Sequence, residues 1–164
     1  MKESGQLNIR KATRDDVPLL MEFIRELSDY EKMSDEVQTT EALLDKNLFG
    51  SDPKAAALIG YLNSEPVCFA VYFFNFSTFL AKPGLYLEDL FVKPVFRGRG
   101  FGKAMLSHLA KIAVKNDCGR FEWAVLDWNK PAIQFYRRLG AKPMYEWTIF
   151  RLTGHDLDHL GGKD

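Results

Sequence analysis

Residues 86–102 read YLEDLFVKPVFRGRGFG, and this stretch decides the fold. An apolar strand over residues 86–92 leads into a short loop and a glycine turn, and an amphipathic helix follows. Glycines at three alternate positions, Gly98, Gly100 and Gly102, remove Cβ atoms where a backbone must approach a ligand closely. The unpaired N–H groups at the start of the helix favour an anion. The segment therefore predicts a turn that binds a diphosphate, helped by a neighbouring arginine.

Two common phosphate-binding motifs do not fit this turn. A dinucleotide-binding turn needs G-x-G-x-x-G, and residues 98–102 lack the final spacing. A Walker loop needs G-x-x-x-x-G-K-[ST], and neither Ser nor Thr follows Lys103. The pattern that fits is R-x-x-G-x-G, formed by Arg97, Gly100 and Gly102. A glycine-rich surface turn without a ligand remains the alternative for this hexapeptide taken alone.

Length and charge narrow the class of protein. The chain has 164 residues with 22 basic and 22 acidic side chains, so the formal net charge is zero. This length and the absence of linkers or repeats predict one domain spanning residues 1–164. A neutral balance argues against nucleic acid as the main partner. The two cysteines, Cys68 and Cys118, show neither zinc nor redox spacing and are expected to be reduced and buried.

Nothing in the sequence indicates a membrane or a secretory route. The longest apolar stretch, residues 67–76, is far shorter than the ~20 residues of a membrane helix. Residues 1–6 are polar and lack the apolar segment of a signal peptide. We therefore expect a cytoplasmic protein without a membrane partner.

The periodicity of the whole chain predicts an α/β fold, a mixed sheet with helices on its faces. Thr13 and Asp16 have the spacing of a capping box before the first helix. Asn129 and Pro131 start a later helix, and Gly140 is expected to end it in a left-handed conformation. A polar tail is expected after the last strand. The predicted strands are 7–10, 55–61, 67–76, 84–92 and 121–126, with a last strand or hairpin at 144–152, and the predicted helices are 17–27, 40–48, 101–114 and 129–139.

The R-x-x-G-x-G pattern resembles the pyrophosphate-binding signature of the GNAT superfamily of N-acetyltransferases. Residues 86–92 resemble the fourth strand of that family, whose bulge exposes backbone N–H groups to the thioester and the pantetheine arm of the cofactor. Residues 128–136, WNKPAIQFY, resemble the later motif W-N-x-x-A-x-x-x-Y, and residues 9–16 resemble the first strand-to-helix junction. The resemblance covers residues 7–152 and implies the GNAT fold, a mostly antiparallel central sheet in a single domain.

Within this superfamily the chain is most similar to the spermidine/spermine (diamine) and thialysine N-acetyltransferase group. The strings that carry this similarity are RELSDYEK, YLED and AVLDWN, and the last favours the thialysine branch. Residues 77–80, Ser-Thr-Phe-Leu, depart from the Asp and Trp of the polyamine enzymes. The similarity implies direct transfer of an acetyl group from acetyl-CoA to the primary amine of a small molecule, without a metal.

Two residues are expected to carry the catalysis. An alkyl ammonium with a pKa near 10.4 must lose a proton before it can attack the thioester. Glu88 is the predicted base, acting directly or through a water, and a surface or ion-paired carboxylate is the alternative. By resemblance, Tyr136 donates a proton to the leaving thiolate, and packing into the core is the alternative. Strand alternation places Asp89 on the opposite face from Glu88, where it pairs with a lysine or lines the acceptor channel.

The resemblance also implies two sets of binding residues. A backbone N–H near Leu90 or Phe91 would polarise the thioester carbonyl. The residues expected to bind the donor are Leu90, Phe91, Val92, Arg97, Gly98, Arg99, Gly100, Phe101, Gly102, Lys103, Asn129, Pro131, Ala132 and Tyr136. The residues expected to bind the acceptor are Tyr30, Glu31, Glu88, Glu122, Trp123 and Glu146. Residues 26–41 hold six acids and one base, which suits an ammonium but is also typical of a solvated helix face.

Two alternatives to a small-molecule acetyltransferase stay open. A protein or peptide N-acetyltransferase is the alternative enzyme, since acids near Tyr30 also suit basic peptides. A non-catalytic acyl-CoA-binding protein is the alternative outside enzymes. For the state of assembly, family behaviour implies a homodimer with the late strands at the interface.

Overall fold

The computed structural model describes residues 6–163, so residues 1–5 of the polar N-terminal segment, where no signal peptide is predicted, lie outside the described residues. Strands and α-helices follow one another along the chain largely as predicted, joined by three short 3-10 turns. The elements are β1 (Asn8–Lys11), η1 (Arg14–Asp16), α1 (Val17–Tyr30), η2 (Ser34–Glu36), α2 (Glu41–Phe49), β2 (Ala56–Leu62), β3 (Glu65–Ser77), β4 (Lys82–Val92), η3 (Pro94–Phe96), α3 (Phe101–Lys115), β5 (Arg120–Trp123), α4 (Lys130–Arg138) and α5 (Gly154–Leu160).

The chain divides into two compact units, Met1–Ala124 and Val125–Asp164. The first unit contains every strand together with α1, α2 and α3, and the second contains α4 and α5. That residues 1–164 act as one domain stays a prediction.

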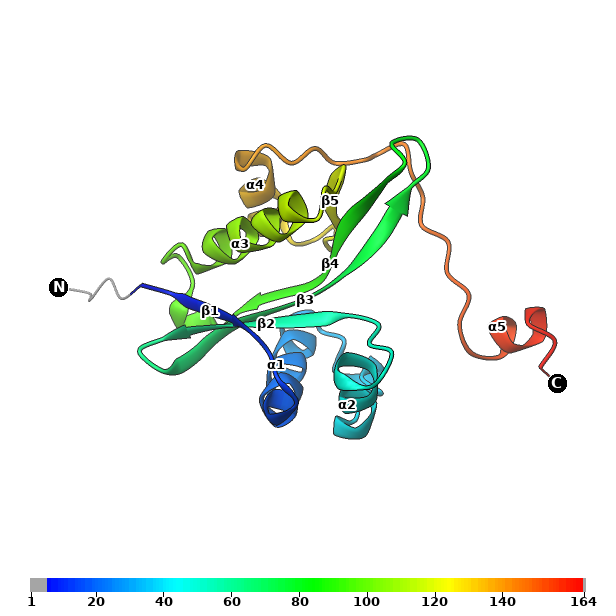
Figure 1. Cartoon of the computed structure of the whole chain (residues 1–164), viewed down its shortest axis with the longest axis horizontal. Helices are drawn as coiled ribbons and strands as arrows, with labels where there is room; N and C mark the ends of the chain where they lie inside the picture. The colour runs from blue at the N-terminus through cyan, green and yellow to red at the C-terminus, as the bar shows by residue number, and fades with distance from the viewer. Residues whose placement is uncertain (1–5, 164) are drawn as a thin grey trace. The chain divides into compact units, whose positions relative to one another are not determined.

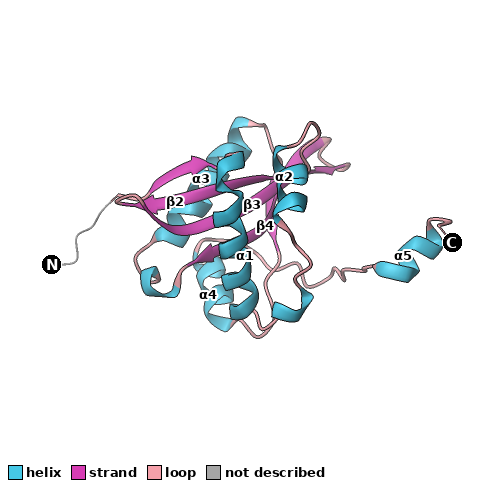
Figure 2. Ribbon diagram, turned by 90° about the horizontal axis from the view of Figure 1, so that it is seen from below, coloured by secondary structure: helices cyan, strands magenta, loops and turns pink. Residues whose placement is uncertain are grey.

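The first unit is built on a five-stranded sheet in the order β1-β2-β3-β4-β5. The strands from β1 to β4 are antiparallel, and β5 runs parallel to β4. Helices α1 and α2 cover one face of this sheet and α3 covers the other (Figures 1 and 2). The predicted α/β class and the mostly antiparallel sheet are therefore confirmed.

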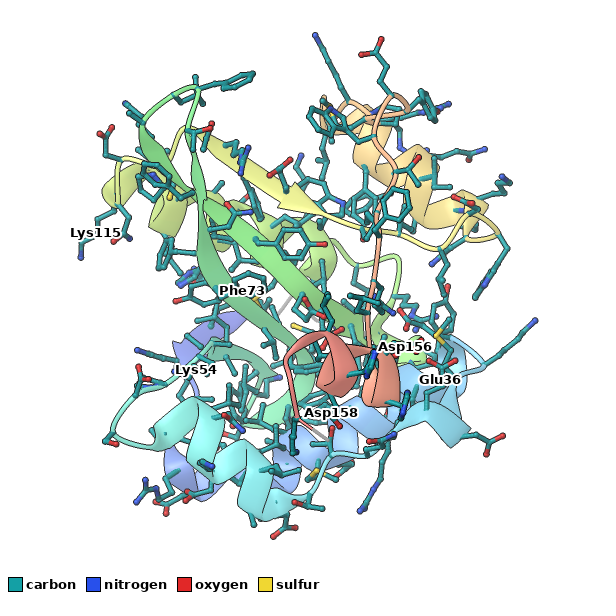
Figure 3. The ribbon with its side chains drawn as sticks, turned by 90° about the vertical axis from the view of Figure 1, so that its right-hand side faces the viewer. Glu36, Lys54, Phe73, Lys115, Asp156 and Asp158 are labelled. Atoms are coloured by element: carbon teal, nitrogen blue, oxygen red, sulfur yellow. The ribbon has the colours of Figure 1, made fainter. Side chains whose placement is uncertain are left out.

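The core lies between the sheet and its helices. On the α1 face, Phe23 of α1 stacks on Phe69 of β3 with ring centroids 5.0 Å apart, and Ile59 of β2 is buried beside them. Side chains alternate along a strand, so Cys68 and Ala70 of β3 lie on the opposite face, on the side of α3, where Met105 and Leu109 are fully buried. Further along the hairpin, Phe73 (labelled in Figure 3) lies opposite Tyr86, with ring centroids 5.1 Å apart. Each full burial of such a side chain contributes about 1.5–3 kcal/mol.

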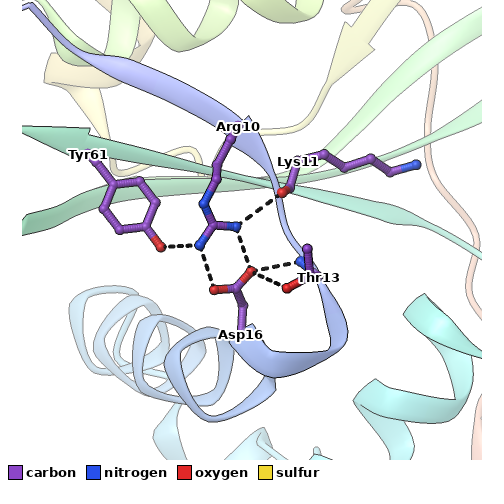
Figure 4. Close-up of polar contacts among 5 residues, drawn as sticks. All are labelled: Arg10, Lys11, Thr13, Asp16 and Tyr61. Carbon is purple, nitrogen blue, oxygen red and sulfur yellow. Dashed lines mark hydrogen bonds and ion pairs between the residues drawn. The ribbon is translucent and has the colours of Figure 1, made fainter. Parts of the chain in front are cut away.

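A polar network joins β1, β2 and the start of α1 (Figure 4). Arg10 donates two hydrogen bonds to the Asp16 carboxylate, at 2.7 and 2.8 Å, and a third to the Tyr61 hydroxyl. The same carboxylate accepts the backbone N–H of Thr13 at 2.7 Å, which confirms the predicted capping interaction. These hydrogen bonds, with that of Arg10 the largest effect, lower the pKa of Asp16 to about 2.

The predicted strand 144–152 is wrong, because the structure has neither helix nor strand there. Its apolar composition favours a strand, but a strand also needs a hydrogen-bonding neighbour, and composition does not say whether one is present. The strand predicted at 121–126 is shorter, since β5 ends at Trp123. The predicted polar tail contains a short helix, α5, that the sequence did not indicate. No helix within residues 6–163 is long and apolar enough to cross a membrane.

Candidate active site

A β-bulge in β4 marks the centre of the candidate site. Leu87 lies opposite Tyr72 and Asp89 lies opposite Val71, so Glu88 is an extra residue without a partner position on β3. An extra residue of this kind locally bends the strand and redirects its side chains. The bulge implied by the family resemblance is therefore present, and it places Glu88 at an exposed position.

Three carboxylates gather at this bulge. Burial, and then the charges of Glu88 and Glu31, raise the pKa of Asp89 to about 7. Burial also raises the pKa of Glu31. That Asp89 and Glu88 lie on opposite faces stays a prediction, and the charge of Glu88 acts on Asp89 in either case. Asp89 is the functional candidate that sequence reasoning undervalued, since its neighbour Glu31 lies 58 positions away.

Glu31 reaches this cluster because α1 ends beside β4. Tyr30 is the last residue of α1, and its ring packs against that of Phe91 at 6.4 Å. Glu31 caps the helix and donates its backbone N–H to the Leu27 carbonyl. Two predicted acceptor residues, Tyr30 and Glu31, therefore lie in one place with Asp89.

The edge of β4 opens on its other side at the bulge. Pairing with β5 covers Gly84 to Leu87, where Trp123 lies opposite Leu87. Within residues 6–163, no strand pairs with residues 88–92 along this edge. An unpaired edge presents backbone N–H and C=O groups, which suits the predicted contacts of Leu90, Phe91 and Val92 with a donor.

The glycine turn before α3 has the backbone that its sequence predicts. Gly98 and Gly100 have φ angles of +73° and +84°, a left-handed region that disfavours other residues. A Cβ at either position would meet nothing within 4 Å, so the space in front of the turn is open. The first N–H groups of α3 have no acceptor within the helix. Phe101 is buried and can contribute only its backbone, whereas Lys103 is exposed in the first turn. This arrangement fits a diphosphate.

The two arginines of the turn have different surroundings. Arg97 donates from Nε to the Val92 carbonyl at 2.8 Å, and its guanidinium lies 4.4 Å from the ring centre of Tyr30. The Arg99 guanidinium instead lies against Phe96 and Phe101, at 5.6 and 5.2 Å.

The β5 candidates are already engaged within the first unit. Glu122 forms an ion pair with Arg120, with 2.8 Å between Oε1 and Nε. The ring of Trp123 packs edge-on against Phe121 at 5.0 Å. These contacts do not connect Glu122 or Trp123 to the carboxylate cluster. The strand register, however, places Trp123 beside the bulge.

The second unit contains the remaining predicted residues. Asn129 is the N-cap of α4, with its side chain accepting the Ala132 N–H at 3.4 Å, and Pro131 lies in the first turn. The ring of Tyr136 packs beside Phe135 at 5.4 Å. The predicted cap and the left-handed Gly140 are confirmed, with a φ of +90°. Glu146 is exposed. The catalytic role of Tyr136 stays a prediction.

Comparison with known proteins identifies the class to which this fold and site belong. Residues 20–141 match the family described as "Acetyltransferase (GNAT) family", and the chain belongs to it. It is an N-acetyltransferase of a family that uses acetyl-CoA as the acetyl donor.

Individual relatives extend the likeness over almost the whole chain. A thialysine N-epsilon-acetyltransferase of Sus scrofa is 37% identical over 166 residues, which cover 94% of this chain and 97% of that protein. An L-ornithine N5-acetyltransferase of Arabidopsis thaliana is 32% identical, covering 93% and 86%. Among solved structures, an integron cassette protein from the mobile metagenome of V. cholerae has a TM-score of 0.80 at 26% identity, covering 94% of this chain and 97% of that one. The resemblance to the thialysine group is confirmed.

Proposed function

We propose that this enzyme transfers an acetyl group from acetyl-CoA directly to the primary amine of a small molecule that carries a second polar group. A thialysine-like amino acid is the first choice, and a diamine or polyamine the next. The observation that carries this proposal is the cluster of Glu31, Glu88 and Asp89 at the bulge of β4. Acidic side chains favour a cationic amine, and the relatives named above act on thialysine and on ornithine.

The donor would be held at the carboxyl end of β4 and at the start of α3. The N–H groups of residues 98–103 suit the diphosphate, and the exposed Lys103 adds a positive charge. The open edge of β4 suits the pantetheine arm and the thioester carbonyl, with a backbone N–H of Leu90 or Phe91 as the oxyanion donor. In the second unit, Asn129, Pro131 and Ala132 at the start of α4 complete the proposed donor set.

Proton removal falls to the carboxylates. Glu88 is exposed at the bulge and is the proposed base, directly or through a water. Asp89 is the second candidate, because a pKa of about 7 lets it accept a proton at physiological pH. Tyr136 is the proposed proton donor to the coenzyme A thiolate.

Direct transfer is favoured over an acyl-cysteine intermediate. Cys68 is fully buried, and burial raises its pKa to about 12. Cys118 is only partly buried, so the prediction that both cysteines are buried is wrong for it; this partial burial, and then the charge of Asp117, raise its pKa. A thiol in such surroundings is a poor nucleophile at neutral pH.

A substrate panel tests the proposal. Purified protein with acetyl-CoA is offered thialysine, ornithine, 1,3-diaminopropane, spermidine and a lysine-containing peptide, and thiol release and product mass are measured. We expect acetylated thialysine or another small amine. Turnover of the peptide alone would make the chain a peptide N-acetyltransferase. Binding of coenzyme A without any turnover would make it a non-catalytic acyl-CoA-binding protein.

We also propose that the enzyme is a cytoplasmic homodimer. Residues 144–152 expose several large apolar side chains, among them Tyr145, Trp147 and Phe150 at 77%, 74% and 92% exposure. Such a run favours a covering partner, and a second copy is proposed, with neither nucleic acid nor a membrane as a partner. The two free cysteines are consistent with a reducing compartment.

A further inference from the structure

We propose that Arg97 is a positioning residue that couples binding of the acetyl donor to binding of the amine. This inference rests on the proposed function. Sequence alone assigned Arg97 to the diphosphate, as part of the R-x-x-G-x-G pattern. Its surroundings instead connect the glycine turn to the end of α1, where the proposed acceptor residues lie.

Three contacts hold the Arg97 side chain in this position. Its Nε donates to the Val92 carbonyl, the last residue of β4, at 2.8 Å. Its guanidinium lies 4.4 Å from the ring centre of Tyr30 and 5.3 Å from that of Phe91. A planar guanidinium can stack on an aromatic ring and donate a hydrogen bond at the same time, which a lysine ammonium cannot reproduce. Arg97 therefore ties three elements together, namely β4, α1 and the turn before α3.

The position of Tyr30 controls the acceptor end of the site. Tyr30 directly precedes Glu31, and the charge of Glu31 reaches Asp89. Tyr30 also packs against Phe91, two residues after Asp89 on the same strand. Holding the Tyr30 ring in place thus fixes where Glu31 stands relative to Asp89, and so the distance between the carboxylates that an amine would bridge.

The other end of this connection is the glycine turn. Arg97 directly precedes Gly98, whose backbone would lose conformational freedom when a diphosphate binds to the turn. Ordering of the turn by the donor would order Arg97, and through it Tyr30. Because coupling between two binding sites is reciprocal, the bound amine would then increase the affinity for the donor by the same factor.

Arg99 provides a matched control in the same turn. Its guanidinium lies against Phe96 and Phe101, which belong to the loop and to α3 rather than to the acceptor end of the site. Loss of the Arg99 charge is expected to weaken binding of the donor and to leave binding of the amine unchanged.

The test measures the dissociation constant of the amine by calorimetry, with and without saturating coenzyme A, together with the KM of each substrate. The amine is the best acceptor of the panel, thialysine in our proposal. We expect coenzyme A to tighten amine binding in the wild type about tenfold, and Arg97→Met to reduce this factor to below about twofold. The variant should raise the amine KM about tenfold, because a cation–π contact and a hydrogen bond are lost, while the acetyl-CoA KM changes less than about threefold. Arg97→Lys should lose most of the coupling, and Arg99→Met should raise the acetyl-CoA KM and keep the coupling.

A double substitution separates positioning from general damage. Tyr30→Phe keeps the ring and should keep the coupling, whereas Tyr30→Ala should lose it. Adding Arg97→Met to Tyr30→Ala should then cost nothing further. An Arg97→Met variant with a raised acetyl-CoA KM and intact coupling would make Arg97 a phosphate ligand and overturn the inference, while the proposed function stands. A wild type that acetylates no panel amine would instead overturn the proposed function, and the inference with it.

Discussion

Asp16 shows how one side chain fastens two elements of this fold. Its carboxyl is 11% exposed, and its pKa is about 2 because Arg10 and Thr13 donate hydrogen bonds to it. A carboxyl with a lowered pKa in the folded state stabilises the fold above its unfolded pKa, here 3.8, and this stability is lost as pH falls toward 2.

Asp16→Asn is therefore expected to lower the free energy of unfolding by about 2 kcal/mol at pH 7. Urea unfolding monitored by circular dichroism measures this change. The deficit should shrink as the pH falls from about 4 toward 2. Asp15→Asn, at the exposed neighbouring position, is the control and should change stability by less than about 0.5 kcal/mol. An equal deficit at pH 7 and pH 2.5 would contradict the role assigned to the charge.

The contribution of Asp89 to stability depends on pH in the opposite direction to that of Asp16. Its pKa is raised from 3.8 to about 7, so its ionisation in the folded state costs stability, and the cost grows as pH rises from about 4 to about 7. Asp89→Asn should therefore raise the Tm at pH 8 and leave it nearly unchanged at pH 4.

The same substitution should lower activity. In the wild type, kcat/KM for the amine is expected to rise up to about pH 7 as Asp89 loses its proton, and this step should disappear in Asp89→Asn. Glu88→Gln should lower kcat by about a hundredfold or more if Glu88 is the base. Glu36→Gln, at an exposed residue of η2 that is labelled in Figure 3, is the control for removal of an acid. Unchanged kinetics in both Asp89→Asn and Glu88→Gln would remove the carboxylates from the mechanism.

At the scale of elements, the glycine turn offers a test in which strain and function separate. Gly100→Ala places a Cβ at a φ of +84°, which costs about 1–2 kcal/mol and distorts the N–H groups that face the proposed diphosphate. We expect the dissociation constant of coenzyme A, measured by calorimetry, to rise at least about tenfold. Gly140→Ala imposes a similar strain at a φ of +90°, after α4, and should leave that constant unchanged. Equal effects of the two variants would mean that strain alone weakens binding.

Some elements follow from local sequence, and others do not. The sequence predicts α3 well, because its apolar period and the preceding glycines lie within one stretch. It also predicts the strands β3 and β4, because each is an apolar run and turn residues lie between them. It fails for residues 144–152, since pairing depends on a neighbour rather than on composition.

The same distinction holds within the candidate site. The glycine turn and the Asn129 cap are local patterns, and the sequence predicts both. The contact of Arg97 with Tyr30 joins residues 67 positions apart, and no local signal indicates it. The raised pKa of Asp89 likewise depends on burial and on Glu31, which only the fold supplies.

At the scale of the whole molecule, the exposed apolar run predicts self-association. We expect light scattering to give twice the mass of the 164-residue chain, and Trp147→Glu to shift the mass toward the monomer. Phe79→Glu is the control, because Phe79 is 98% exposed at the tip of the β3–β4 hairpin and lies outside the run. A monomeric wild type would leave residues 144–152 without the partner proposed for them.

The bulge in β4 has one more consequence. Leu87 and Asp89 already face the sides that an uninterrupted ladder would give to two consecutive residues, since their partners Tyr72 and Val71 are adjacent. A chain from which Glu88 alone is deleted could therefore still pair β3 with β4, and every side chain would keep its face of the sheet. The sheet therefore does not require Glu88, whereas the proposed reaction does.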